Sequence, residues 1–383
     1  MAPDFNSLRR LALGAINDRV IPGMVMAVGQ AGQVRFAEAF GQRQIDPVPA
    51  PATVETVYDL ASLTKALVTS VLVMRGVGQG LLHLDRPLGD HLELLRDRPE
   101  VTVRRVLAHA GGFPAHRKFY ESGLATVTPS QANREAMVRW AAALPLAYEP
   151  GSRSVYSDLG FILLGALVEQ VMSERLDALA ERLIFRPLGL STLGFVDLLA
   201  GPPAAQFRGQ DVAPTERCPV RGRLVAGEVH DLNTFVMGGI AGHAGLFGAV
   251  RDVLALALAL CSAYHGHRVG QGGVGDAPMV QPEVLRACWQ PAGIPGSTWR
   301  LGWDGPSAKG SLAGDLLSRH AVGHLSFTGC SLWIDPEQET CVVILTNRVH
   351  PEVRDDPRFR ALRPALHDAA LQAIGYQAKL DRP

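Results

Sequence analysis

The chain has 383 residues, of which 47% are hydrophobic and 19% are charged. This composition is too apolar for a disordered chain, and the length is sufficient to bury a large core. Lys and Arg together number 37, as do Asp and Glu, so the formal net charge is zero and provides no general attraction to nucleic acid or to an anionic membrane.

No segment is typical of export or of membrane insertion. The apolar stretch near the N-terminus is short and is broken by Asn17 and Asp18, and no run reaches the roughly 20 apolar residues of a spanning helix. The five cysteines are scattered and form no Cys-x-x-Cys pair, which is typical of free thiols in a reducing compartment. We therefore expect a cytoplasmic protein.

The first third of the chain predicts a helix, a hairpin and a second helix. An amphipathic pattern covers residues 7–19, and two strand-like runs at 24–28 and 34–40 flank a turn at 29–32. A Pro-rich loop at 43–54 precedes an apolar helix at about 62–76.

The rest of the chain predicts mostly helices, followed by a second hairpin and a last helix. Helical patterns occupy 133–143, 159–172, 176–184 and 250–263, and the Gly-rich residues 266–277 predict a mobile loop. Strand patterns at 324–334 and 340–346 are separated by the turn 335–338, and the final helix covers about 356–374.

Strands at both ends and helices between them favour an α+β fold. The two hairpins can join in one antiparallel sheet that is flanked by the terminal helices, with a large, mostly helical lobe inserted between them. We expect a single catalytic domain over residues 1–383, with an α/β lobe at about 1–60 and 235–383 and a helical lobe at about 61–234.

One lysine lies where a lysine is costly. The chain has only four lysines, and Lys65 lies within one of its most apolar helical patterns. Burial lowers the pKa of a lysine, and an amine with a lowered pKa is suited to proton abstraction. Ser62 is three residues earlier, so both side chains share one helix face. A nucleophile, a base and the free N–H groups of a first helical turn are thus predicted together. Alone, the pair could also be a lysine that reaches from a helix edge to solvent.

Two further elements could complete this site. Tyr156 precedes a predicted helix, and a tyrosine beside an ammonium can have a lowered pKa and relay a proton. Asp158 could join it or could simply cap that helix. His324 opens a predicted strand whose edge could lend a backbone N–H to an oxyanion hole, although an isolated histidine is more often a structural residue.

Taken together, Ser62-Leu63-Thr64-Lys65, Tyr156-Ser157-Asp158 and His324-Leu325-Ser326 resemble the three motifs of the serine β-lactamase and penicillin-binding-protein superfamily. The likeness is to its branch of class C β-lactamases, D-stereospecific peptidases and β-lactamase-like esterases. It covers nearly the whole chain, with further matching stretches at 106–114, 186–190, 242–247 and 331–336.

The resemblance implies roles for these residues. Ser62 would attack an ester or amide carbonyl and become acylated, and Lys65 and Tyr156 would share the proton transfers. The backbone N–H groups of Ser62 and Phe327 would form the oxyanion hole. Asp158, His324, Ser326 and Phe327 would contact the substrate.

Two positions depart from the superfamily pattern. Asp158 stands where the motif usually has Asn, and Ser326 stands where it usually has Gly. A serine side chain there should narrow the site or redirect the ligand, which disfavours efficient β-lactamase activity and leaves room for an impaired or specialised enzyme.

The sequence predicts no cofactor and no metal. His230, Asp231 and His243 could suggest a metal site, but no His-Glu-x-x-His or paired-Cys pattern supports one. A glycine-rich turn near the cleft is the better interpretation of His243.

We therefore expect a serine hydrolase, an esterase or an amidase/peptidase, that acts on a small ester, amide or peptide. Two alternatives remain: a catalytically impaired protein that binds a peptide or cell-wall fragment, and an acyltransferase that uses the same serine. The sequence indicates neither a nucleic-acid partner nor an oligomeric state.

Overall fold

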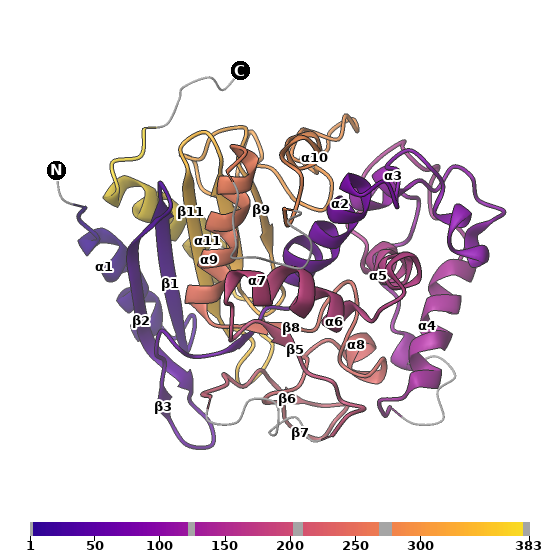
Figure 1. The fold of residues 1–383 in the computed structure, drawn as a ribbon. Coiled ribbons are helices and arrows are strands. Elements are labelled where there is room, and N and C mark those ends of the chain that lie inside the picture. The colour runs from indigo at the N-terminus through magenta and orange to yellow at the C-terminus, as the bar shows by residue number, and fades with distance from the viewer. Residues whose placement is uncertain (1–2, 122–126, 202–209, 268–277, 378–383) are drawn as a thin grey trace.

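A computed structural model describes residues 3–121, 127–201, 210–267 and 278–377. At its centre is an antiparallel sheet of six strands in the order β3-β2-β1-β11-β10-β9 (Figure 1). The strands are β1 (Gly23–Gln30), β2 (Gln33–Gln44), β3 (Ala50–Pro51), β9 (Val322–Leu325), β10 (Ser331–Asp335) and β11 (Thr340–Thr346). Because β1 pairs with β11, the predicted α+β class and the joining of the two hairpins are confirmed.

Helices cover both faces of this sheet, which explains why β1 is buried on both sides. Met24, Met26 and Val28 pack in a core with the terminal helices, whereas Val25 and Ala27 belong to the other core, because successive side chains of a strand point to opposite faces. The covering helices are α1 (Asn6–Asn17) and α11 (Pro357–Ala373) on one face and α9 (Val250–Tyr264) on the other (Figure 1).

The helical part lies beside the sheet (Figure 1). Its longer elements are η1 (Lys65–Ser70), α2 (Val71–Gly78), α3 (Val103–Leu107), α4 (Gln131–Ala143), α5 (Asp158–Met172), α6 (Leu176–Ala180), η5 (Glu181–Phe185), α8 (Leu232–Val236) and α10 (Pro282–Cys288). Shorter turns are η2 (Leu88–Asp90), η3 (Glu93–Leu95), η4 (Phe119–Glu121) and α7 (Arg186–Leu188). Two small sheets join them, β4 (Tyr58–Asp59) with β8 (Leu246–Gly248) and β5 (Gly194–Phe195), and β6 (Arg217–Cys218) with β7 (Arg223–Leu224).

One predicted element is wrong. The single strand expected over 324–334 is two strands, β9 and β10, joined by a tight turn. The Ser326 N–H donates to the Cys330 carbonyl at 2.8 Å, and Gly329 adopts a positive φ of 113°, a conformation that favours glycine. The third motif therefore runs from a strand into a turn. Most of the predicted loop at 266–277 lies outside the described residues.

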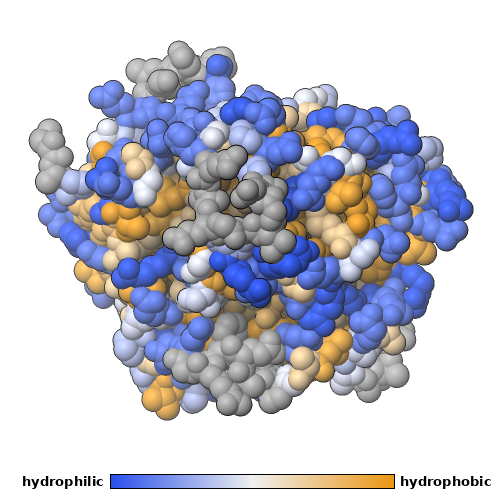
Figure 2. All heavy atoms as spheres, in the orientation of Figure 1, coloured by the Kyte–Doolittle hydropathy of each residue, from blue (hydrophilic) through white to orange (hydrophobic). Residues whose placement is uncertain are grey.

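No helix in the described ranges has both the length and the apolar character that are needed to cross a bilayer. Figure 2 shows hydrophilic residues over much of one face, with apolar residues in scattered groups between them.

Candidate active site

Ser62 lies in a fixed turn between β4 and the helix that carries Lys65. The preceding residue, Ala61, has a φ of 44°, in the left-handed region that non-glycine residues rarely occupy. Its N–H donates to Asp59 Oδ1 at 2.8 Å, and its carbonyl accepts from the Thr64 hydroxyl at 2.5 Å. These two bonds hold the strained turn that presents the Ser62 side chain.

The structure brings Ser62 and Lys65 together. Lys65 is fully buried, and its Nζ donates to Ser62 Oγ at 3.1 Å and to the His243 carbonyl at 2.9 Å. A third contact joins Nζ to Asp158 Oδ1 at 2.8 Å. Lys65 begins the π-helical stretch η1, and π-turns of this kind occur frequently at functional sites.

The predicted direction of the Lys65 pKa shift is wrong. Burial by itself lowers this pKa, but the Asp158 carboxylate and the Tyr156 side chain together raise it above the ordinary lysine value. The apolar sequence around Lys65 indicates the loss of water but does not indicate an anion next to the amine. Lys65 is therefore an ammonium in the resting site.

Tyr156 packs beside this ammonium. Nζ of Lys65 lies 4.9 Å from the centre of the tyrosine ring, and Lys65 and Ser62 both act on the phenol to lower its pKa. The rings of His109 and Trp299 lie 4.7 and 5.6 Å from it. Burial raises the pKa of Tyr156 by more than the ammonium lowers it, so the predicted lowered pKa is also wrong.

Asp158 is not the cap of helix α5. Ser157 takes that position, since its hydroxyl accepts the Gly160 N–H at 3.3 Å, and Asp158 is the first residue of the helix. The Asp158 carboxylate bridges two bases, with Oδ1 against Lys65 Nζ and Oδ2 3.2 Å from His116 Nδ1. Burial would raise the pKa of Asp158, but Lys65 and His116 hold it well below its ordinary value.

The third motif contributes less to the pocket than its sequence suggests. His324 is buried, with Nδ1 2.7 Å from the Leu325 carbonyl, and burial together with Lys65 lowers its pKa to about 3. Ser326 is also buried, and its hydroxyl lies 2.9 Å from the Thr328 hydroxyl. The Ser326 side chain is thus held within the turn and is not among the pocket-lining residues, contrary to the expected narrowing of the site.

Phe327 lies in the turn after β9 and lines the same pocket as Ser62. Its ring stacks on His230 with the ring centres 5.3 Å apart. Among the hydrogen bonds of the described residues, none uses the backbone N–H of Ser62 or of Phe327. Two such donors beside a nucleophile can stabilise a developing oxyanion.

The pocket over Ser62 has a volume of about 400 Å³ and is rich in ionisable groups. Besides Asp158 and His116, it is lined by two further pairs of histidine and carboxylate, Glu216 with His230 at 3.2 Å and Asp231 with His243 at 3.0 Å. Within the described ranges, no group of three or more His, Cys, Asp or Glu side chains is arranged to hold a metal ion.

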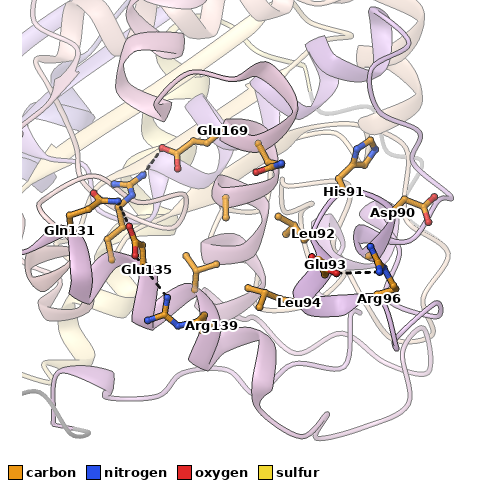
Figure 3. Close-up of a pocket in the computed structure, with 15 residues that line it drawn as sticks. Asp90, His91, Leu92, Glu93, Leu94, Arg96, Gln131, Glu135, Arg139 and Glu169 are labelled. Carbon is orange, nitrogen blue, oxygen red and sulfur yellow. Dashed lines mark hydrogen bonds and ion pairs between the residues drawn. The ribbon is translucent and has the colours of Figure 1, made fainter.

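A larger groove, of about 690 Å³, lies against α4, α5 and the turns near η2 and η3 (Figure 3). Its charged side chains pair with one another, Arg134 with Glu169 at 2.5 Å and Arg96 with Glu93 at 3.2 Å. None of its lining residues is Ser62 or Asp158, both of which line the smaller pocket. The smaller pocket over Ser62 is therefore the candidate active site.

Four residues of the site were not assigned a role from the sequence. No motif singles out His116, Asp59 or His109. For His243 the sequence predicts a place near the cleft, but it does not predict the contact of the His243 carbonyl with Lys65. His109 lies in the matching stretch 106–114, has a φ of 55°, and accepts the Ser157 N–H at 3.0 Å. It thereby fixes the backbone next to Tyr156.

Comparison with known proteins identifies the family of the chain. The family model described as Beta-lactamase matches residues 8–367. The chain belongs to the beta-lactamase family. The suspected resemblance to this group of serine hydrolases is thereby confirmed.

Relatives within the beta-lactamase family differ in their named activities. The chain is 31% identical over 366 residues to a "Putative D-alanyl-D-alanine carboxypeptidase" of Escherichia coli O157:H7, covering 88% of this chain and 81% of the relative. It is 29% identical to an N-acetylmuramyl-L-alanine amidase of Bacillus subtilis (strain 168), covering 87% and 80%. The solved structure of EstCE1, titled a hydrolase with promiscuous acyltransferase activity, matches with a TM-score of 0.72 at 22% identity, covering 95% of this chain and 97% of that one. The structural likeness supports the fold.

Proposed function

We propose that this chain hydrolyses a small ester or amide through an acyl-enzyme on Ser62. The observation that carries the proposal is the 3.1 Å contact between Ser62 Oγ and the buried Lys65 Nζ at the wall of a pocket. A hydroxyl becomes an effective nucleophile when an adjacent group can take its proton. The amide-cleaving names of two relatives are consistent with this reaction.

The roles follow from position. Ser62 attacks the carbonyl carbon, Lys65 in its neutral form takes the serine proton, and Tyr156, which packs beside Lys65, passes a proton to the leaving group. The N–H groups of Ser62 and Phe327 receive the carbonyl oxygen as it becomes negative. Water then attacks the ester on Ser62 and gives one proton to the Tyr156 phenolate, and Lys65 returns its proton to Ser62 Oγ as the bond from Oγ to the carbonyl carbon breaks and the acid is released.

The pocket favours substrates that do not end in a carboxylate next to the cleaved bond. His324 in the third motif is neutral because its pKa is about 3, and the Lys65 ammonium is already paired with Asp158. Neither group therefore offers a free positive charge to a substrate carboxylate. We expect a neutral ester or amide to be cleaved faster than a D-alanyl-D-alanine dipeptide.

A fluorophosphonate probe and intact-mass measurement test the proposal. The wild-type protein should gain one adduct, mapped to Ser62, and the Ser62→Ala variant should gain none and lose at least a thousandfold in turnover of p-nitrophenyl acetate. Ser7→Ala, at an exposed serine of α1, is the matched control and should label like wild type. Equal turnover by Ser62→Ala and wild type would refute the proposal, and binding of an amide without any turnover would favour a binding protein.

A further inference from the structure

Three ionisable side chains connect the nucleophile to the surface. Lys65 is fully buried, Asp158 contacts it through Oδ1 at 2.8 Å, and His116 contacts the other carboxylate oxygen at 3.2 Å. The His116 side chain is 41% exposed at the pocket. One carboxylate is thus shared between a base that solvent cannot reach and a base that it can.

The hydrogen bonds define where the protons are. An ionised carboxylate has no proton to donate, so Nδ1 of His116 carries the hydrogen and donates to Asp158. A second proton on His116 must then bind at Nε2. Besides Asp158, the charged groups that act on His116 are Asp231, which favours its charged form, and Lys118, which opposes it. Tyr120, Glu216 and His230 are the other titratable groups of this part of the pocket.

The resting site as described has no base ready for Ser62. The Lys65 ammonium has its protons directed at Ser62, at the His243 carbonyl and at Asp158. The phenol of Tyr156 is also protonated, because burial raises its pKa. Lys65 must therefore lose a proton before it can accept the one from the serine hydroxyl.

We propose that His116 is a positioning residue that shares Asp158 with Lys65 and provides the second place for this proton. One N–H bond of Lys65 breaks as Asp158 Oδ1 takes the proton. Water then takes that proton from the carboxylate, whose side chain is 19% exposed, and one N–H bond forms at Nε2 of His116, so the net charge of the site is unchanged. Asp158 then pairs with the imidazolium, and the neutral Nζ takes the Ser62 proton as the bond from Oγ to the carbonyl carbon forms. The inference rests on the proposed function of Ser62 and Lys65.

This arrangement makes a distinct prediction for pH dependence. The active form, with a neutral Lys65 and a charged His116, has as many protons as the resting form. The value of kcat/KM should therefore not depend on pH in the range between the pH at which His116 titrates and the pH at which Lys65 titrates. Without a basic group at 116, a neutral Lys65 requires loss of a proton to solvent. Activity should then rise about tenfold per pH unit through neutral and alkaline pH.

Two substitutions separate charge from hydrogen bonding. His116→Gln retains an N–H donor for Asp158 but cannot be charged, and we expect a loss of about tenfold or more at pH 7 that recovers towards pH 10. His116→Arg retains a permanent charge, and we expect it to exceed His116→Gln in activity at pH 7. His320→Gln is the matched control, because His320 also pairs with a carboxylate, Glu337 at 3.4 Å, and neither residue lines the pocket.

A second readout does not require turnover. Since the chain has only four lysines, the Lys65 side chain can be followed by NMR through its labelled Cε carbon. Lys65 should titrate at lower pH in His116→Arg than in His116→Gln. Identical Lys65 titrations in these two variants, or a flat kcat/KM profile in folded His116→Gln, would overturn the inference. Absence of a Ser62 adduct in wild type would instead refute the proposed function, and the NMR comparison would still test the sharing of Asp158.

Discussion

The carboxylate at position 158 determines the charge of the residue next to the nucleophile. An amide at this place could hydrogen-bond with Lys65 but could not hold it as an ammonium. Asp158 does so through the 2.8 Å contact, and the pKa of Lys65 is raised even though the side chain is fully buried. A buried ion pair of this kind contributes little net stability, but loss of one partner leaves the other uncompensated.

Lys65→Met should therefore abolish turnover and also lower the free energy of unfolding, by about 3 kcal/mol. Part of this cost should be recovered in the double variant Lys65→Met/Asp158→Asn, because the isolated carboxylate is then removed. Urea denaturation of the single and double variants measures both values. If the double variant is less stable than Lys65→Met, Asp158 contributes to the free energy of unfolding mainly through a partner other than Lys65.

The sequence predicted the contact between Ser62 and Lys65 but not the charge state of the lysine. Residues three apart on a helix share a face, so that contact is a local property of the chain. The charge depends on residues that the fold brings together, for example His116 with Asp158, which are 42 positions apart. A single sequence contains no spacing rule for such a pair.

Among the structural elements, the turn between β9 and β10 is linked by hydrogen bonds to the turn that carries the nucleophile. Thr328 donates its hydroxyl hydrogen to the Asp59 carbonyl at 2.8 Å, and Asp59 Oδ1 accepts the Ala61 N–H. The turn that carries Phe327 is thus tied to the turn that carries Ser62, and both proposed oxyanion donors depend on that link.

Thr328→Val tests this link, since valine has a similar shape and no hydroxyl. We expect a loss of about 1–2 kcal/mol in the free energy of unfolding, because buried oxygens lose their partner. The value of kcat for p-nitrophenyl acetate should fall by more than the KM rises, because the misplaced N–H of Phe327 acts mainly in the transition state. Unchanged kcat in a folded variant would exclude the coupling of the two turns.

Turn signals predict both hairpins, but they do not indicate the turn inside residues 324–334. The run is apolar on either side of Ser326, Thr328 and Gly329, so it appeared continuous as a strand. Its bend depends on the positive φ of Gly329 and on the hydrogen bond from the Thr328 side chain to the distant Asp59 carbonyl. Only the glycine is visible as a local signal.

Across the whole molecule, several histidines are buried in their neutral form. Burial lowers the pKa of His324 and of His367 to about 3, well below the value of about 6.5 in an unfolded chain. His367 on α11 lies 3.0 Å from the Ser331 hydroxyl on β10. Below pH 6.5 the unfolded chain therefore binds more protons than the folded one, and stability must fall as the pH falls.

We expect the free energy of unfolding to decrease from about pH 6.5 downwards, by up to about 1.4 kcal/mol per pH unit for each such histidine. Glutamine cannot be protonated in this range. His367→Gln should therefore reduce the change in the free energy of unfolding per pH unit by the contribution of one histidine. Denaturation at a series of pH values between 7 and 4 measures it, with the exposed His91→Gln as control. A slope unaffected by His367→Gln would mean that this ring is already charged in the folded protein.

The pairing of the first strand with the last also has a consequence for synthesis of the chain. The Thr346 hydroxyl donates to the Gly23 carbonyl across 323 residues, and residues 24–30 of β1 pair with β11. As the polypeptide leaves the ribosome, the hairpin of β1 and β2 emerges early, yet one of its edges has no native neighbour until almost everything else has been translated. Ribosome-bound fragments that stop short of β11 should therefore expose an open strand edge and depend on chaperones for protection from aggregation.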